Sequence, residues 1–211
     1  MMIEIKHATT QDVLYRIEQN SLLDAQLDNA KIAGADLSNL DLRGVTFRNA
    51  DLRDVNFSGA NLQGAILKNA DLSRANFESA NLQQVDLTNA FLDDACFIEA
   101  DLSHAILRYS KMSKADCTGA TLVRADISLA DLNQVNCNDA NMAHSDLRGT
   151  NLAGANLNGA NLTGANMLDA KMVDVQMTGV HMENAIGPHG KMVPIHRMKT
   201  KHSRWWEFWK R

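Results

Sequence analysis

The chain has 211 residues, of which 45% are hydrophobic, and its 21 Lys and Arg stand against 25 Asp and Glu for a formal net charge of −4. This length allows one domain or two small ones, and no apolar run reaches the ~18 residues needed to cross a bilayer. The first ten residues lack the basic and apolar regions of a signal peptide, so we expect a cytoplasmic protein with reduced thiols.

Residues 1–19 predict an N-terminal cap, which we interpret as a β-hairpin. Apolar residues alternate with mostly polar neighbours in two runs, first Ile3 and Ile5 and then Val13, Tyr15 and Ile17. Such alternation is typical of strands with one buried face, and the polar segment 7–12 supplies the turn. A short helix over residues 9–19 is the alternative interpretation.

Residues 20–185 form one uninterrupted five-residue repeat. Every fifth residue from Leu22 to Met182 is apolar, and these 33 positions hold 19 Leu, 6 Met, 4 Phe, 2 Ile and 2 Cys. Two residues before them, 32 positions hold 22 Ala and 6 Val. Two residues after them, 22 of 33 positions are Gly, Asn or Asp, residues that tolerate a positive φ at a turn.

A period of five excludes the ordinary secondary structures. Five residues advance ~500° around an α-helix, so the apolar stripe would wander around the cylinder. In a flat strand, an odd period would send successive apolar side chains to opposite faces. A coil that turns a corner every five residues avoids both problems, because each short side then points its central residue inward.

The repeats ADLSN, ADLRD, ANLQG, ADLSR, ANLNG and ANLTG resemble the A(D/N)LXX pattern of pentapeptide repeat proteins. The resemblance covers about four-fifths of the chain. It implies an all-β fold, a right-handed quadrilateral β-helix with 20 residues per coil, and its handedness follows from the resemblance alone. The 33 repeats would then make about eight coils between an N-terminal cap and a short helical or irregular tail.

Aromatic and sulfur residues mark the predicted core. Three phenylalanines are 20 residues apart and two cysteines continue the same column: Phe57, Phe77, Phe97, Cys117 and Cys137. We interpret the two thiols as small buried apolar residues, with a disulfide as the less favoured alternative. The inward positions of the last coil are all methionine, at Met167, Met172, Met177 and Met182.

The tail, residues 186–211, is basic and aromatic. It carries seven Lys and Arg against Glu207, whereas residues 20–185 carry 12 Lys and Arg against 21 Asp and Glu. Ser203 is suited to cap a short helix, and the tail contains Trp205, Trp206, Phe208 and Trp209. We treat these rings as partner-binding candidates. The tail has three alternatives: docking on the methionine coil, exchange within a dimer, or capture of another molecule.

No catalytic constellation is present in the sequence. It contains no GxSxG elbow, P-loop or HExxH motif, and no GxGxxG follows a predicted strand. The histidines have no recognised metal-ligand spacing, and the regularly spaced aspartates are typical of repeat scaffolding. We therefore expect no enzymatic activity, no cofactor and no metal.

Four apolar residues stand at outward positions of one side of the predicted coil: Ile66, Ile106, Tyr109 and Leu129. Together they form a candidate patch for a protein partner or a dimer. The alternative is that they are scattered surface residues of the ordinary kind.

Three functions follow. The leading one is a non-catalytic protein–protein interaction or scaffold module, whose tail docks an unknown partner or forms a homodimer through the C-terminal end. The resemblance also implies an alternative, because the family includes quinolone-resistance proteins whose acidic rods mimic DNA and bind DNA gyrase, a type II topoisomerase. The unbroken register, without protruding loops, and the asparagines near the C-terminal end argue against it: Asn151, Asn156, Asn161 and Asn166.

The third function is peripheral membrane association. Trp beside Lys and Arg favours the bilayer interface, so the tail would lie on a membrane surface. We expect no direct binding of nucleic acid in any of the three cases.

Overall fold

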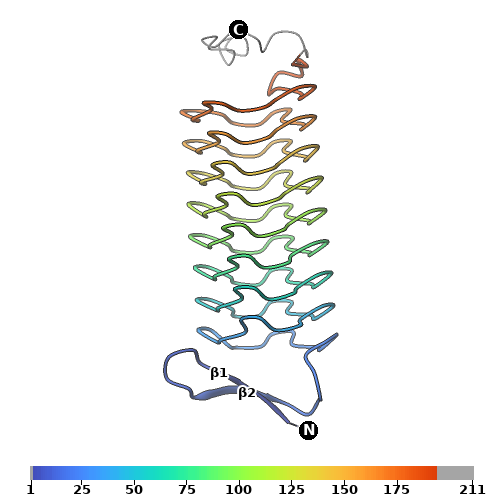
Figure 1. Cartoon of the computed structure of the whole chain (residues 1–211), viewed down its shortest axis with the longest axis vertical. Coiled ribbons are helices and arrows are strands. Elements are labelled where there is room, and N and C mark those ends of the chain that lie inside the picture. Colours follow the sequence, from blue (N-terminus) through green and yellow to red (C-terminus); the bar gives the residue numbers. More distant parts are fainter. Residues whose placement is uncertain (1, 194–211) are drawn as a thin grey trace.

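The computed structural model describes residues 2–193, so the predicted aromatic tail from residue 194 onward lies outside the described residues. The described chain winds into a tall four-sided coil with a short hairpin at its N-terminal end (Figure 1). Residues 2–193 contain no helix long and apolar enough to span a membrane.

The N-terminal cap is the hairpin and not the alternative helix. Strand β1 spans Ile3–Lys6 and pairs antiparallel with strand β2, Val13–Ile17. In the turn between them, the Nδ1 of His7 accepts hydrogen bonds from the backbone N–H groups of Thr9 and Thr10, each at 3.2 Å.

The hairpin is joined to the first coil through its first strand. The backbone N–H of Asp36 donates to the carbonyl of Lys6 at 3.1 Å, and that of Ala8 donates to the carbonyl of Gly34 at 2.8 Å. The side chain of Ile5 is 2% exposed and extends the core of the coil. The hairpin therefore closes the lower end of the coil, which would otherwise expose unpaired backbone and apolar side chains.

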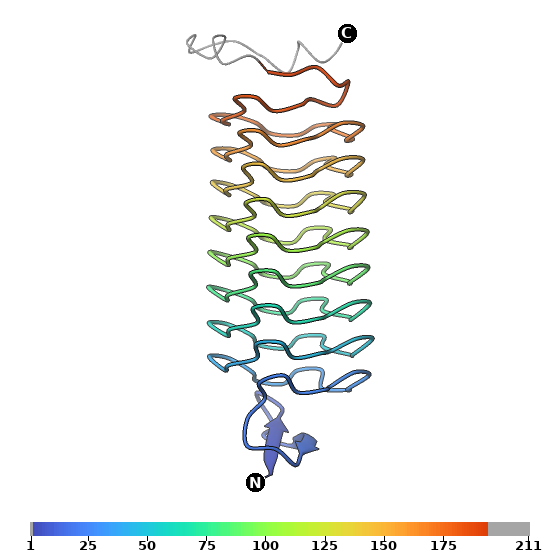
Figure 2. The same cartoon turned by 90° about the vertical axis from the view of Figure 1, so that its right-hand side faces the viewer.

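Each coil of the rod contains 20 residues. Parallel bridges link residues 20 apart along the chain, from Gln26 with Thr46 to Asn166 with Ile186. The stacked coils form a right-handed quadrilateral β-helix (Figures 1 and 2), as the resemblance to pentapeptide repeat proteins implied. Neighbouring strands are ~4.8 Å apart, and backbone hydrogen bonds join each coil to the next along the rod.

Every corner of the coil is built in the same way. All 33 residues from Asp24 to Asn184 at the position two after the inward residue have a positive φ, between 55° and 72°. In nearly every repeat the next backbone N–H donates back to the carbonyl of the inward residue, as Ala25 does to Leu22 at 3.1 Å. A positive φ at the third residue of such a turn defines type II, which favours Gly and Asn.

The Asp and Asn residues that precede the inward residue have a specific role at these corners. Their Oδ1 atoms accept the backbone N–H two residues later, as Asp36 does from Ser38 at 3.1 Å and Asn56 does from Ser58 at 3.1 Å. Such side-chain-to-backbone bonds satisfy N–H groups that no neighbouring strand reaches. They explain why Asp and Asn are frequent at this position.

The inward side chains fill the rod completely. The rings of Phe57 and Phe77 stack with centroids 5.0 Å apart, and those of Phe77 and Phe97 stack at 4.9 Å. Ser110, Ser145 and Thr150 replace Ala on the inside, and each hydroxyl donates to the carbonyl three residues earlier. Their polarity is therefore compensated within their own turn.

At the upper end the chain leaves the coil and folds back. Ile186 pairs antiparallel with Met192, and the N–H of Val193 donates to the carbonyl of Ala185 at 2.8 Å. Residues 186–193 thereby cover part of the last coil. Within the described residues Val173 of that coil remains 63% exposed.

Two of the corner residues have bulky apolar or aromatic side chains that are poorly suited to a positive φ. Tyr109 and Leu129 have φ values of 59° and 61°, where a bulky side chain costs about 1–3 kcal/mol. Below them the same corner carries asparagines joined by amide hydrogen bonds, Asn69 to Asn49 at 3.1 Å and Asn89 to Asn69 at 3.2 Å.

We therefore predict that Tyr109→Asn raises the free energy of unfolding by about 1 kcal/mol, because Asn tolerates positive φ and extends this amide ladder. Urea denaturation followed by circular dichroism measures the change. Tyr109→Phe keeps the strain and serves as the control, for which no gain is expected. A Tyr109→Asn protein no more stable than the control would contradict the strain at this corner.

The lowered pKa values of carboxylates in the turns indicate that the fold loses stability in acid. The guanidinium of Arg148 and its backbone N–H hold the pKa of Asp146 below its ordinary value of 3.8, despite the opposing effect of burial. Hydrogen bonds from Ser38 likewise lower the pKa of Asp36. A pKa lowered by folding contributes stability that is present above the ordinary value and is lost as the pH falls through the folded value.

We therefore expect unfolding midpoints in urea to drop as the pH falls from about 4 to 2. The double variant Asp36→Asn and Asp146→Asn should show a shallower drop, because an amide oxygen accepts the same N–H without titrating. Asp12→Asn, at a carboxylate outside the coil, is the control and should follow the wild type. Equal acid dependence in all three proteins would show that these turns do not carry the effect.

Candidate interaction surfaces

The coil presents four flat sides, which we number in chain order. Faces 1, 2, 3 and 4 are the sides that carry the repeats 40–44, 45–49, 50–54 and 55–59, together with every repeat 20 residues before or after each. On every face the inward residue and the residue two before it are largely buried, while the other three positions point outward. These outward positions are free to vary without disturbing the core, so any binding chemistry must lie there.

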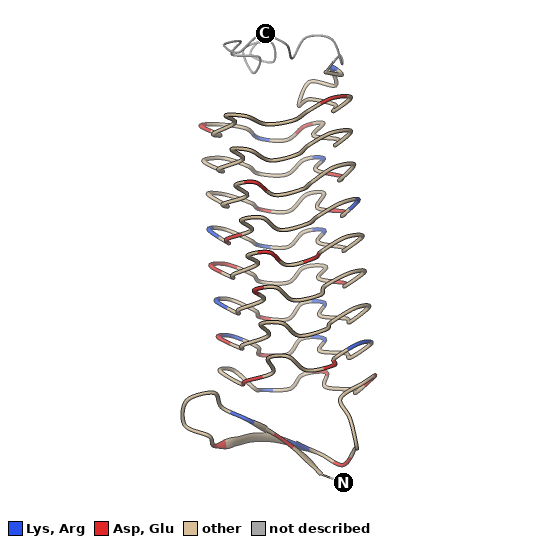
Figure 3. Cartoon of the chain, in the orientation of Figure 1, with Lys and Arg blue, Asp and Glu red and all other residues tan. Residues whose placement is uncertain are grey.

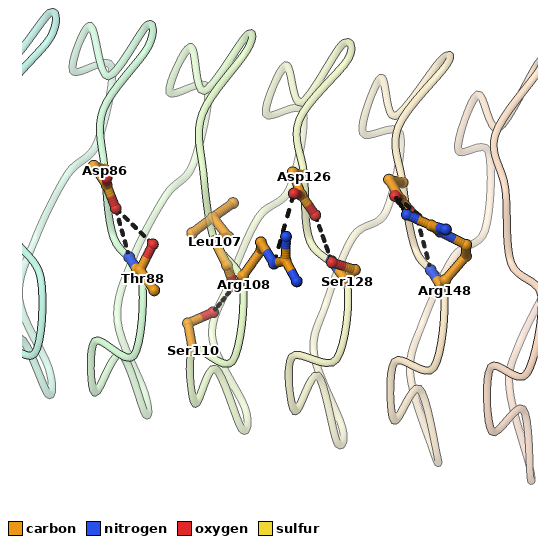
Figure 4. Close-up of polar contacts among 9 residues, drawn as sticks. Asp86, Thr88, Leu107, Arg108, Ser110, Asp126, Ser128 and Arg148 are labelled. Carbon is orange, nitrogen blue, oxygen red and sulfur yellow. Dashed lines mark hydrogen bonds and ion pairs between the residues drawn. The ribbon is translucent and has the colours of Figure 1, made fainter.

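Face 2 illustrates how charge is neutralised on the rod. Figure 4 shows Asp86 with Thr88, Arg108 with Asp126, and Asp126 with Ser128 on successive coils of this face. Burial raises the pKa of Asp86, but hydrogen bonds from Thr88 and Lys68 outweigh it and leave that pKa below its ordinary value. These carboxylates cap turns and lie near cations, an arrangement that differs from an acid–base pair.

Face 4 differs from the other three. It carries five carboxylates and no Lys or Arg, so all 12 Lys and Arg of residues 20–185 lie on faces 1, 2 and 3. The five are Asp36, Glu78, Glu99, Asp116 and Asp139. More than half of the negative balance of the rod is therefore concentrated on one side.

Ion pairs follow the same division. The eight ion pairs within the coil lie on faces 1, 2 and 3, as between Arg43 and Asp41 at 2.6 Å and between Arg74 and Asp54 at 2.6 Å. On face 4, Asp116 instead accepts neutral donors, the hydroxyl of Thr118 at 2.6 Å and the amide of Asn136 at 3.1 Å. Such donors orient a carboxylate and leave its charge in place. Figure 3 shows how the charged residues are distributed along the rod.

The four apolar candidates all lie on face 2, and three of them belong to two successive coils. Ile106, Tyr109 and Leu129 are 37%, 48% and 50% exposed and belong to two successive coils. Ile66 is half-buried and lies two coils below Ile106. The structure thus places a small apolar corner in the middle of the rod.

Two cation–π contacts flank that corner. The guanidinium of Arg108 lies 5.5 Å from the ring centroid of Tyr109, and the ammonium of Lys111 lies 4.8 Å from that of Phe91. Phe91 is 39% exposed at an outward position of face 3. The five-residue pattern treats these positions as variable, and only the 20-residue spacing shows that Lys111 follows Phe91 in one column.

The residues assigned to the core are on the inside of face 4 and in the last coil. Phe57, Phe77, Phe97, Cys117 and Cys137 are at most 1% exposed. The two thiols are free, and hydrogen bonding to Cys137 together with burial raises the pKa of Cys117. Within the last coil Met167, Met177 and Met182 are buried and Met172 is half-buried.

Two further kinds of site remain, a metal site and the aromatic tail. Residues 2–193 contain no group of three or more His, Cys, Asp or Glu side chains that could hold a metal ion. The aromatic candidates Trp205, Trp206, Phe208 and Trp209 lie outside the described residues.

Comparison with known proteins identifies the fold. Among solved structures, the full-length QnrB1, described as a plasmid-mediated fluoroquinolone resistance protein, superposes with a TM-score of 0.68 at 22% identity, covering 80% of this chain and 89% of its own. HetL, a pentapeptide repeat protein involved in heterocyst differentiation regulation from the cyanobacterium Nostoc sp. strain PCC 7120, is 24% identical over 83% of this chain and 94% of its own, with a TM-score of 0.32.

A search of curated proteins found no match. The sequence pattern of the family described as Pentapeptide repeats matches in eight copies, over residues 21–59, 56–94, 95–134, 110–149 and 145–184. These segments cover nearly all of the coil, and the chain therefore belongs to the pentapeptide repeat family.

Proposed function

We propose that the protein is a non-catalytic binding rod that holds a cationic protein surface against face 4. The observation that carries this proposal is the segregation of charge, because five carboxylates share a face that has no Lys or Arg. Uncompensated charge on one side steers and orients an oppositely charged partner. The rigid backbone of the coil keeps the carboxylates in fixed rows, so the surface needs no reorganisation on binding.

A type II topoisomerase is the most specific candidate for this partner. A surface that binds DNA is cationic, and a narrow rod with an acidic side presents the charge such a surface accepts. The likeness in fold to QnrB1, a fluoroquinolone resistance protein, supports testing this enzyme class first. Face 4 carries no carboxylate beyond Asp139 within the coil, which supports a contact on the lower and middle coils.

We expect the wild-type protein to change DNA supercoiling by gyrase at micromolar concentration, with and without a quinolone. The variant Glu78→Lys with Glu99→Lys should lose at least about tenfold in apparent affinity, because it places cations on the acidic face. Arg53 and Lys114 occupy the equivalent repeat positions on face 3, so the coil accommodates this change.

Asp93→Lys with Asp94→Lys is the matched control, since it makes the same change of charge at the same repeat positions of face 3. It should retain the activity of the wild type. No effect of the wild-type protein on gyrase excludes the topoisomerase. Equal losses in both variants would show that net charge and not face 4 governs binding.

We further propose that the basic, aromatic tail is a docking or dimerisation element. The support is compositional, because all three tryptophans of the chain and seven of its 21 Lys and Arg lie in residues 186–211. Light scattering of residues 1–202 against the full chain should show a smaller particle if the tail holds a dimer. Co-sedimentation of both proteins with anionic liposomes tests the membrane alternative, for which only the full chain should sediment.

A further inference from the structure

Face 3 has an order of charges that makes it complementary to itself. Its residues just before the inward position form one column, in which each residue bridges the next: Asp71, Phe91, Lys111, Asp131, Asn151 and Lys171. A second outward column of the same coils contains Arg74, Asp94, Lys114, Gln134, Gly154 and Asp174. In both columns, two charged residues at equal distances below and above the level midway between Lys111 and Asp131 always have opposite signs.

From this order we propose that a second copy of the chain packs antiparallel on face 3, with the two-fold axis across the rod between the coils of Lys111 and Asp131. Such an axis keeps the lateral position of a residue and inverts its height. Coils on either side of the axis therefore face each other, so a residue at one height meets the same repeat position at the mirrored height of the partner.

Three pairs of opposite charge then meet across the interface, each of them twice. Lys111 faces Asp131 next to the axis. Further out, Asp71 faces Lys171 and Arg74 faces Asp174. No residue of the two columns faces a residue of like charge, since Phe91 meets Asn151, Asp94 meets Gly154 and Lys114 meets Gln134.

Several of these charges are available to a partner. Lys111 contacts the ring of Phe91, and Asp131 accepts the amide of Asn151 at 2.8 Å. Asp71 lies at 3.8 Å from Arg53, and Arg74 is bonded to Asp54 at 2.6 Å, so these two would share their charge with the partner. The central pair between Lys111 and Asp131 thus gains most from association.

Other arrangements on the same face are disfavoured by charge. Moving the axis by half a coil places either Lys111 or Asp131 opposite its own copy. Moving it one coil down places Asp71 opposite Asp131 and Lys31 opposite Lys171. A parallel two-fold would bring Lys111 and Lys114 of both copies together. Of these arrangements, only the proposed axis brings no like charges together, which selects one register.

The strained corner supports the same axis independently. Tyr109 and Leu129 lie at the boundary of faces 2 and 3, 20 residues apart in the coils on either side of the axis. The two-fold operation places the Tyr109 of each copy beside the Leu129 of the other. Nothing in the fold requires these two side chains to be strained and exposed. In the dimer both would contribute to the edge of the interface.

Face 3 suits a second copy better than face 4 does. Face 3 carries seven carboxylates and six Lys and Arg, so two such faces approach with little net repulsion, whereas two copies of face 4 would repel. The six coils in contact span about 29 Å, and a contact of this height and one face wide belongs to the small, weak class of interfaces. We expect association at high concentration that weakens with salt.

Sedimentation velocity of the full chain in low salt, up to several hundred micromolar, tests the proposal. The wild type should show a dimer, and the single variants Lys111→Asp and Asp131→Lys should each weaken it at least about tenfold, because each puts like charges beside the axis twice. An equimolar mixture of the two variants should restore the dimer, since every central pair then regains opposite charges. The double variant with both changes should also dimerise.

Both substitutions use residues that the same column already contains, with Asp at 71 and Lys at 171, so the fold should tolerate them; thermal unfolding checks this. Lys31→Asp lies on the same face but outside the six paired coils, and it should leave the dimer unchanged. A monomeric wild type overturns the proposal. So does a dimer that survives both single variants, as a contact through the tail would, or a mixture that stays monomeric.

The test does not depend on the proposed partner of face 4. The same two-fold operation places the face 4 of both copies on one side of the dimer, because the lateral order of faces is kept. A lost dimer with unchanged gyrase activity, or the reverse, therefore separates the two proposals.

Discussion

The left-handed corner is the constraint on which the rest of the rod depends. The chain turns once in five residues because the residue two after each inward side chain adopts a φ near 60°. That turn directs the next outward residue to bridge the strand 20 residues on, as Asp51 does with Asp71, and it keeps every central side chain inside. If one corner opened, the register of every later coil would shift relative to the core.

The same constraint frees the surface for function. The fold uses the small residue, the apolar residue and the corner, and it uses an Asp or Asn only as a turn cap. Lys, Ile, Phe and Thr also occupy this capping position, as at Lys111 and Phe91, so the cap is dispensable at individual repeats. The fold therefore leaves the outward charges free to vary. This freedom permits one face without Lys or Arg beside another that carries charges of both signs.

The strained residues fit this division of roles. A corner accepts almost any side chain at a cost in strain. Every corner residue other than Gly, Asn or Asp nevertheless lies in the middle of the rod, from Arg74 to His144. The ends of the rod keep unstrained corners, where fewer neighbouring coils hold the chain in place. In the middle, coils on both sides stabilise a corner, so exposed bulky side chains such as Tyr109 and Leu129 are retained there.

The amino-acid sequence alone indicated the family, the uninterrupted register, the hairpin and the identity of the inward residues. These features follow from local patterns, namely the five-residue period within residues 20–185 and the alternation of apolar residues before it. A single repeat did not show which outward residues lie together, since those are 20 residues apart and meet only when four corners close one coil. The family resemblance implied the coil length and placed Ile66, Ile106, Tyr109 and Leu129 on one side, but it showed none of their contacts. The pairing of Phe91 with Lys111, the isolation of the carboxylates of face 4 and the turn-capping role of the aspartates were decided by the tertiary structure. The physical reason is that neighbours on a solenoid surface are set by the coil length, which the closed hydrogen-bonded coil fixes and a single repeat does not.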